Sequence, residues 1–432
     1  MRILVAAMPF AGHATPMRAV ARALVGRGHE VVACTGRRYG TGFVDAGAEL
    51  ATWRHAPDFD DRDLRATFPQ LTNGRGPRAV VTNLEHVFLR TGEGQARDIL
   101  EAGPFDVLVS DHLALGSVLA AELTGTPVAT VALVPLSMPS RDLPPAGVGL
   151  APMRGWAGRA RDGALRRASG LALRRLDRVL DEVRAALGLP PALVTALDAF
   201  WSSQLVVAHG SAALEYPRSD LPRQVHFVGQ LSASPVGAPV PPWWDEVTRA
   251  GRRVVHVTQG TYDVAPRDLL LPTLCGLATL DVQVLAATGG GTLPAAAVPA
   301  HAHQAPFLPY DRLLPRTSVV VTNGGWGGVL ASLAAGVPLV VAGGTLDKPD
   351  IARRVAWSGA GLDLRTGSPS PRQARTAVQR VLDDPGFRTR AEEIGRSLAG
   401  LGGAGTAASL VEQLGTSRRP VLRSGEPWIA EG

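Results

Sequence analysis

Hydrophobic residues along the first part of the chain occur in short continuous runs that alternate with amphipathic stretches. A run at 3–8 is followed by a loop at 9–16, a helical pattern at 17–28 and a second run at 29–34. Runs without polar interruption are typical of parallel strands that are buried on both faces. The strand–helix–strand order recurs at 105–133. The pattern therefore predicts an open parallel α/β sheet.

The pattern is interrupted once, by a stretch rich in proline, serine and glycine at 231–242, which is typical of a linker. It begins again at 252–261 and ends with helices at 371–383 and 388–399. We therefore expect two α/β domains of similar design, and a cleft between them is the default ligand site. The predicted units are domain 1–230, linker 231–242, domain 243–415 and a poorly ordered tail at 416–432.

Composition and charge exclude several classes of protein. The chain has 432 residues, 45% of them hydrophobic, and a net charge of +6. Cys34 and Cys275 are too few for a disulfide framework or a cysteine-rich zinc site. Lys348, the only lysine among 44 basic residues, follows Asp347 rather than glycine, which excludes a phosphate-binding P-loop. The arginines are scattered, which argues against nucleic-acid binding, and the densest basic segment, 159–184, is predicted to be a solvated helix face.

One stretch resembles a membrane span by hydropathy alone. Residues 317–346 contain no charged side chain, but Asn323, Pro338 and seven glycines interrupt them. We interpret the stretch as strand, turn, helix, turn and strand, and reject a membrane span. The amino-terminal sequence MRILVAAMPF predicts a strand rather than a signal peptide. We therefore expect a cytosolic protein with no membrane partner.

Two polar residues lie at the carboxyl ends of predicted strands. His13 lies in the loop after the first strand, a favoured ligand position in open α/β sheets, and its near-neutral pKa suits proton transfer. The alternative is a polar residue that begins a helix, with Pro16 in the first turn. Asp111 ends a later strand and could orient a histidine from the first loop, or Ser110 or Asp111 could cap a helix. If the strand continues past Asp111, we expect the adjacent His112 to point the other way.

The strongest candidate is the sequence Asn-Gly-Gly-Trp-Gly-Gly at 323–328, between a buried strand and an uncharged helix. Glycines let backbone N–H groups approach a ligand, and a helix N-terminus carries about half a positive charge. This favours binding of a diphosphate without metal or lysine, and a tight turn is the alternative. Gly260 and Thr261 form a smaller copy, in which the Thr261 hydroxyl could bond a phosphate. Asp347, beside Lys348, is either a sugar-binding carboxylate or a helix cap.

One short acidic motif could bind a metal ion, but we interpret it as part of a solvated loop. Asp58 and Asp60 form a D-x-D string of the kind that some sugar transferases use to hold a divalent ion. No predicted strand leads into it, and the surrounding aspartates and arginines are typical of a solvated loop. We therefore expect no metal site.

At these positions the chain resembles the two-domain glycosyltransferases of the GT-B fold, in particular the family-1 enzymes that glycosylate actinobacterial natural products. The resemblance covers nearly the whole chain. Gly12 and His13, followed by Pro16, match the family's G-H-x-x-P loop, whose histidine is the general base, and Asp111 falls on its aspartate partner. Residues 305–341 resemble the family's donor-binding signature.

The resemblance implies two Rossmann-like parallel-sheet domains that face each other across a cleft. It also implies an inverting, metal-independent sugar transfer from a TDP- or UDP-sugar, a co-substrate rather than a cofactor, to a hydroxyl of a lipophilic small molecule. The catalytic residues are then His13 and Asp111. The expected donor-binding residues are Gly12, Gly260, Thr261, Phe307, Leu308, Asn323, Gly324, Gly325, Gly327, Gly328, Asp347 and Lys348. Phe10, Phe59, Phe88 and Met138 are the expected acceptor lining, with ordinary core as the alternative.

Three positions depart from the family pattern. Asn323 stands where the family usually has histidine, Lys348 where glutamine is frequent, and Gly328 where serine or threonine is frequent. The departures concern the choice of donor and not the predicted base. Two other functions stay open from the residues alone: an epimerase of the same shape that acts on the nucleotide sugar, and a non-catalytic nucleotide-sugar-binding partner of a transferase. A homodimer is a further open alternative.

Overall fold

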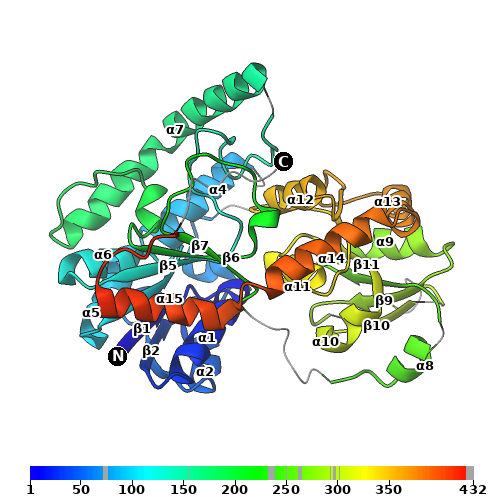
Figure 1. Cartoon of the computed structure of the whole chain (residues 1–432), viewed down its shortest axis with the longest axis horizontal. Helices are drawn as coiled ribbons and strands as arrows, with labels where there is room; N and C mark the ends of the chain where they lie inside the picture. The colour runs from blue at the N-terminus through cyan, green and yellow to red at the C-terminus, as the bar shows by residue number, and fades with distance from the viewer. Residues whose placement is uncertain are drawn as a thin grey trace.

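The chain folds around two sheets that lie side by side (Figure 1). Every ladder between named strands in the described residues is parallel, which confirms the predicted two-sheet α/β architecture. The computed structural model describes residues 1–71, 76–153, 155–231, 239–249, 251–260, 265–291, 293–294, 298–300 and 302–424. Most of the predicted linker therefore lies outside the described residues.

The first sheet has seven strands in the order β3-β2-β1-β4-β5-β6-β7. Its strand order changes direction between β1 and β4, which are neighbours. The strands are β1 (Arg2–Ala6), β2 (Glu30–Thr35), β3 (Glu49–Thr52), β4 (Val107–Asp111), β5 (Val128–Ala132), β6 (Leu205–His209) and β7 (Val225–Gly229).

The second sheet has six strands in the order β10-β9-β8-β11-β12-β13, and its change of direction lies between β8 and β11. Its strands are β8 (Val254–Thr258), β9 (Gln283–Ala287), β10 (Ala302–Ala305), β11 (Thr317–Thr322), β12 (Leu339–Val341) and β13 (Gly361–Asp363).

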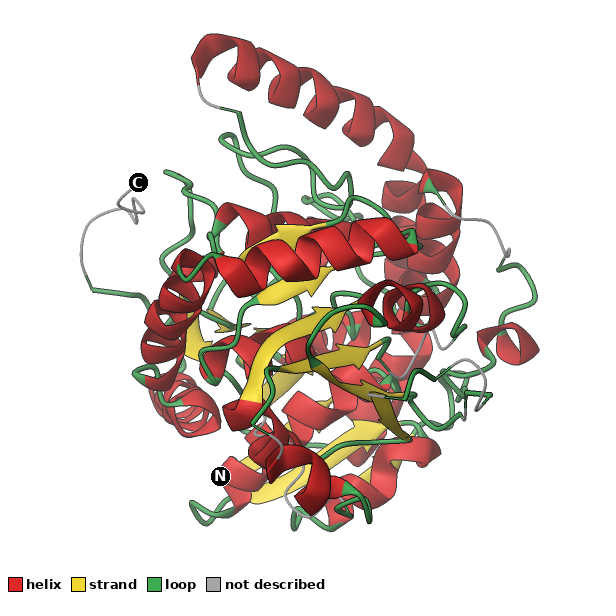
Figure 2. Ribbon diagram, turned by 90° about the vertical axis from the view of Figure 1, so that its right-hand side faces the viewer, coloured by secondary structure: helices red, strands yellow, loops and turns green. Residues whose placement is uncertain are grey.

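Helices cover both faces of the sheets (Figure 2). Along β1, Ile3 and Val5 join one hydrophobic cluster and Leu4 and Ala6 the other, which explains the unbroken apolar run. The helices of the first half are α1 (Ala11–Val25), α2 (Arg37–Val44), α3 (Leu64–Thr67), α4 (Pro77–Asn83), α5 (Gly92–Ala102), α6 (Leu115–Thr124) and α7 (Gly155–Ala186). Those of the second half are α8 (Trp244–Arg249), α9 (Leu270–Leu277), α10 (Tyr310–Leu313), α11 (Trp326–Ala334), α12 (Lys348–Trp357), α13 (Pro371–Asp383), α14 (Gly386–Ala399) and α15 (Gly403–Ser417).

The last helix returns to the first sheet. In Figure 1, α15 lies along the N-terminal lobe, and Val411 and Leu414 are buried with residues of β1 and β4. The second domain was expected to extend to residue 415, whereas the chain leaves it before α15 begins. The tail was expected to be poorly ordered, but Val421 is buried and its N–H donates to the carbonyl oxygen of Gln204. Residues 425–432 lie outside the described residues.

Helix α1 begins earlier than the sequence predicts. Residues 9–16 were expected to be a loop, yet the helix starts at Ala11 and contains Pro16. The N–H of Ala11, which has no partner inside the helix, donates to the carboxylate of Asp61 over 3.0 Å. Pro16 is tolerated because only one helical hydrogen bond is lost near the beginning of the helix. His13 therefore lies in the first turn of α1.

No helix in the described part of the chain is long and apolar enough to cross a membrane.

Candidate active site

Both groups of predicted site residues lie where the strand order of a sheet changes direction. His13 follows β1, and Asp111 ends the adjacent strand β4. In the second sheet, Gly260 follows β8, and residues 323–328 follow the adjacent β11. Ligands of open α/β sheets bind at such points, outside the carboxyl ends of the strands.

The structure brings His13 and Asp111 together. Nδ1 of His13 lies 2.6 Å from Oδ2 of Asp111, and the Asp111 side chain is fully buried. The backbone N–H groups of Met8 and Leu113 also donate to this carboxylate, over 3.1 and 3.0 Å. Asp111 does not cap α6, because the N-cap residue of that helix is Ala114. The carboxylate instead orients the imidazole.

The charges around the pair shift both pKa values. Burial alone would lower the pKa of His13, but the Asp111 carboxylate outweighs this effect and raises the pKa above its ordinary value. Burial alone would raise the pKa of Asp111, but His13 and His112 hold it well below its usual range. Asp347, in the other domain, also raises the pKa of His13. The two domains therefore place these two residues near each other.

His112 lies on the same side as the pair, because the condition for it to point away, a strand that continues past Asp111, is not met. The strand ends at Asp111 and the alternation of side chains ends with it. The His112 ring is stacked between the rings of His13 and Trp201, at centroid separations of 6.1 and 5.2 Å. Its Nδ1 is buried 3.3 Å from Oδ1 of Asp111. Two imidazoles thus flank one carboxylate.

Three of the four expected acceptor residues gather beside His13. The Phe10 ring lies 5.4 Å from that of His13, 5.2 Å from Phe59 and 5.9 Å from Phe88. Phe59 is buried in the core, whereas Phe10 and Phe88 are only partly buried. Met138 instead packs against a separate hydrophobic cluster that contains Leu136 and Val206.

The glycine-rich turn leads into α11 as the sequence predicts. Gly324 has a φ of +91°, and a Cβ there would lie 3.0 Å from Val341, so the position favours glycine. Gly325 is the N-cap, and a Cβ at Gly327 or Gly328 would meet open space. No side chain caps the helix, and its first turn carries no acidic residue. The first backbone N–H groups of α11 are therefore available to an anion.

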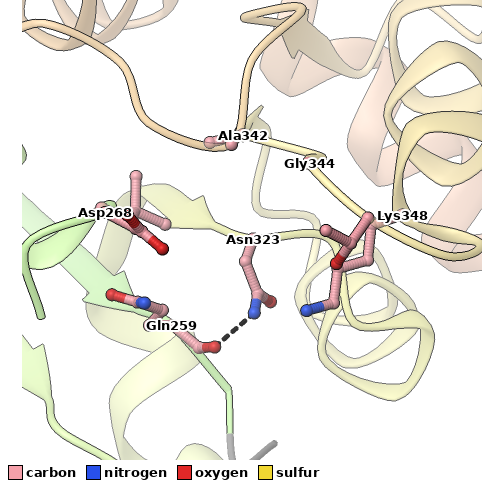
Figure 3. A pocket seen from close by; sticks show the side chains of 9 residues that line it. Gln259, Asp268, Asn323, Ala342, Gly344 and Lys348 are labelled. Atoms are coloured by element: carbon pink, nitrogen blue, oxygen red, sulfur yellow. Dashed lines mark hydrogen bonds between the residues drawn. The ribbon is translucent and has the colours of Figure 1, made fainter. Parts of the chain in front are cut away.

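A small recess lies beside this turn, between the ends of β8, β11 and β12. Figure 3 shows Asp268 and Gln259 on one side of it and Lys348 on the other, with Asn323 between them. The Asn323 side-chain amide donates a hydrogen bond to the carbonyl oxygen of Gln259. Asn323 therefore joins the two loops that follow the central strands of this sheet. Thr261 lies outside the described residues.

The two charged donor candidates begin α12. Asp347 occupies the N-cap position, yet its side chain makes no capping hydrogen bond, and burial raises its pKa above the usual value. Lys348 is buried and lines the recess (Figure 3). Of the predicted base-binding residues, Phe307 is 54% exposed, whereas Leu308 is buried in the core of the second domain. Gly12 is exposed next to His13.

The D-x-D aspartates are paired with arginines. Asp58 lies 3.5 Å from Nε of Arg37, and Asp60 pairs with Arg38. A second group, His55, Asp98 and Glu101, has its ligand atoms within 4.8 Å of one another. The Asp98 carboxylate already accepts the N–H groups of residues 54–56, so it closes that loop on α5.

Known proteins share sequence with this chain along nearly its whole length. A family model described as "Erythromycin biosynthesis protein CIII-like, C-terminal domain" matches residues 272–401. The 4'-demethylrebeccamycin synthase of Lentzea aerocolonigenes is 39% identical over 96% of this chain and 99% of its own. The chain belongs to the natural-product GT-B glycosyltransferases.

Solved structures agree with this fold. The crystal structure of the kitacinnamycin glycotransferase superposes with a TM-score of 0.74 at 21% identity, over 95% of this chain and 98% of that one. The glycosyltransferase VinC in complex with dTDP superposes with a TM-score of 0.65 at 20% identity, over 96% and 100% of the two chains. The predicted GT-B architecture is confirmed.

In this glycosyltransferase, sequence analysis missed a contact between the domains. Trp326, within the glycine-rich turn, donates from its indole Nε1 to the carbonyl oxygen of His209, 2.7 Å away at the end of β6. The neighbouring Gly210 has a φ of +141°, and a Cβ there would lie 3.1 Å from the indole. The only signal in the sequence was a large side chain among four glycines. Deeper in the same interface, Arg354 of α12 pairs with the buried Glu215 over 3.0 Å.

Proposed function

We propose that this glycosyltransferase is an inverting, metal-independent enzyme. It moves a sugar from a TDP- or UDP-sugar to a hydroxyl of a lipophilic natural-product aglycone. The observation that carries the proposal is the 2.6 Å contact between His13 and Asp111, in a domain whose partner domain presents the uncapped N-terminus of α11. A base and an anion site at the two switch points match the needs of a direct displacement.

The proton is handled by His13. The Asp111 carboxylate only accepts hydrogen bonds, so Nδ1 of His13 carries its hydrogen toward Asp111 and Nε2 retains its lone pair. Nε2 then takes the proton of the acceptor hydroxyl as the oxygen attacks the anomeric carbon. Asp111 stabilises the imidazolium that forms. Phe10 and Phe88 supply apolar surface for a lipophilic acceptor beside the base.

The leaving group is stabilised by the second domain. The bond from the anomeric carbon to the diphosphate oxygen breaks, and the oxygen keeps the electron pair. The backbone amides at the beginning of α11 and the Lys348 ammonium provide positive charge for the departing diphosphate without a metal ion. Asp347 would accept hydrogen bonds from the sugar. Attack from the side opposite the leaving group inverts the anomeric configuration.

The relatives support a nucleoside diphosphate donor. VinC was solved in complex with dTDP. A relative named UDP-glycosyltransferase 2, from Phaeomoniella chlamydospora, is 30% identical over 91% of each chain. The exposed Phe307 would stack on the base of either nucleotide.

The test is a product analysis. The enzyme is incubated in EDTA with a TDP- or UDP-sugar and a panel of hydroxylated aromatic and macrocyclic aglycones, and the products are analysed by mass spectrometry. The expected result is an aglycone heavier by one sugar residue, with an inverted anomeric configuration by NMR. An altered sugar on the nucleotide without acceptor would indicate the epimerase. Nucleotide-sugar binding without turnover across the panel would indicate the non-catalytic partner.

A further inference from the structure

Helix α7 extends well beyond the sheet that it covers. It runs for 32 residues, and Leu176 and Leu180 in its carboxyl-terminal half are buried in the core of the first domain. Its amino-terminal half projects past the sheets in both views (Figures 1 and 2). The proposed reaction uses no residue of this projecting half.

The inner side of the projecting half is covered by the chain itself. Nη1 of Arg166 donates to the carbonyl oxygen of Leu143, and Nη2 of Arg161 to that of Ala151, over 2.7 and 2.8 Å. A Cβ at Gly158 would collide with Met153. The segment 143–153 thus packs along one side and leaves the other side to solvent.

The outer side of α7 carries a basic and apolar face that begins on the projecting half and continues onto the carboxyl-terminal half. At 100° per residue, its members fall within a sector of about 120°. Trp156 is 80% exposed and Leu171 61% exposed, and the four arginines are exposed as well. None of the four guanidinium groups has a hydrogen-bond or ion-pair partner in the part of the chain that the structure describes. The outer face consists of Trp156, Arg159, Arg167, Leu171, Arg174 and Arg178.

The acidic residues of α7 do not neutralise the outer face. Asp162 is buried and pairs with Arg161. Asp177 and Asp181 accept the N–H groups of Ala196 and Ala192, and Glu182 pairs with Arg90 on the body of the domain. Asp177 and Asp181 fall within the sector of the outer face but beyond the projecting half, and the four arginines leave the face with a net positive charge.

We propose that the outer face of α7 docks on the anionic headgroup surface of a lipid bilayer. Arginine side chains can pair with lipid phosphates while tryptophan and leucine enter the interface, as in helices that lie in the plane of a membrane. The face is the convex surface of a single helix rather than a groove or pocket. It is therefore better suited to bind a flat surface, such as a bilayer, than a folded protein. Each arginine near an anionic surface is expected to raise the partition coefficient about fivefold.

Docking would place the acceptor side of the enzyme near the bilayer. The carboxyl-terminal half of α7 contacts the segment 84–89, which contains Phe88. A lipophilic acceptor dissolved in the membrane would then lie close to its site. This consequence rests on the proposed function, whereas lipid binding itself does not. A protein that binds vesicles but transfers no sugar would therefore contradict only the proposed function.

The test compares vesicle binding by the full-length protein and two charge-matched variants. The probes are phosphatidylcholine vesicles with and without 30% phosphatidylglycerol. One variant combines R159E, R167E and R174E. The control combines R372E, R375E and R380E on the exposed surface of α13, which changes the net charge equally. Thermal unfolding checks that both variants fold.

The expected result is sedimentation with the anionic vesicles alone, weakened at high salt. The α7 variant should lose about 100-fold in partition, Trp156→Ala about threefold or more, and the α13 variant little. Equal losses of vesicle binding in the two triple variants would show that binding depends only on net charge, and would overturn the proposal. Binding to neither vesicle type would also overturn it. So would a dimer in light scattering that Trp156→Ala dissociates, because a second copy would then cover the face.

Discussion

The indole Nε1 of Trp326 donates to the carbonyl oxygen of His209 over 2.7 Å, and this bond joins the first turn of α11 to the end of β6 in the other domain. The proposed diphosphate site and the domain that holds the proposed base therefore share a buried contact. Reaction rates depend steeply on the relative placement of reacting groups, so this contact bears on catalysis although neither residue touches the reacting atoms in the proposed mechanism.

Trp326→Phe removes the indole N–H and keeps most of the ring. We expect kcat to fall about 10- to 100-fold, since the His209 carbonyl loses its partner and the domains lose a fixed position. Donor affinity, measured by calorimetry with TDP or UDP, should change by less than about threefold, because the backbone amides of α11 are unaltered. Trp156→Phe on α7 is the matched control and should keep the wild-type kcat. An unchanged kcat in the Trp326→Phe variant would show that the contact does not position the domains for catalysis.

The pH dependence of kcat/KM reports the protonation of His13. Burial lowers the pKa of His13 but the Asp111 carboxylate raises it more, so the pKa of His13 lies above the ordinary value of a histidine. A base must be deprotonated to act, so kcat/KM should rise with pH through an apparent pKa above that value.

Asp111→Asn removes the charge that raises the pKa of His13. The acidic limb of the profile should move to lower pH, while the maximum rate falls. Asp347→Asn, which removes a weaker influence on the same imidazole, should move the limb less. A limb at the same pH in the Asp111→Asn variant would mean that another group titrates.

Asn323→Asp tests the bond between the loops after β8 and β11. The substitution replaces an amide that donates to the carbonyl of Gln259 with a carboxylate that cannot, and places two acceptors face to face. The free energy of unfolding should fall by about 1–3 kcal/mol, with a lower Tm in calorimetry and weaker donor binding. Asn323→Ala should lower the free energy of unfolding by less than Asn323→Asp, because alanine adds no repulsion between two acceptors. Equal stability of the aspartate variant and the wild type would contradict the donor role of the amide.

Much of the fold could be predicted because its strands are buried on both faces. Runs such as 3–8 and 317–322, which contain no charged residue, are typical of parallel strands that are buried on both faces. His13 and Asp111 could be brought together from sequence because both follow strands that are neighbours at the switch point. The family resemblance then assigned their roles.

Other features depend on contacts that no local pattern encodes. The start of α1 was placed too late, because the preference for proline in a first turn does not reveal that Asp61 accepts the N–H of Ala11. The amphipathic pattern of α15 gives its buried side but not the sheet that it covers. The direction of the His112 side chain depended on where β4 ends, and the sequence alone did not show that the strand stops at Asp111.

The most direct test of the account is His13→Ala, assayed for sugar transfer and for donor binding in the same preparation. We predict that kcat falls about 10²- to 10⁴-fold, while the Kd of TDP or UDP measured by calorimetry stays within about twofold. This result would separate the base in the first domain from the diphosphate site in the second. A loss of donor affinity in step with kcat would show instead that His13 maintains the structure of the site, and the proposed mechanism would be wrong.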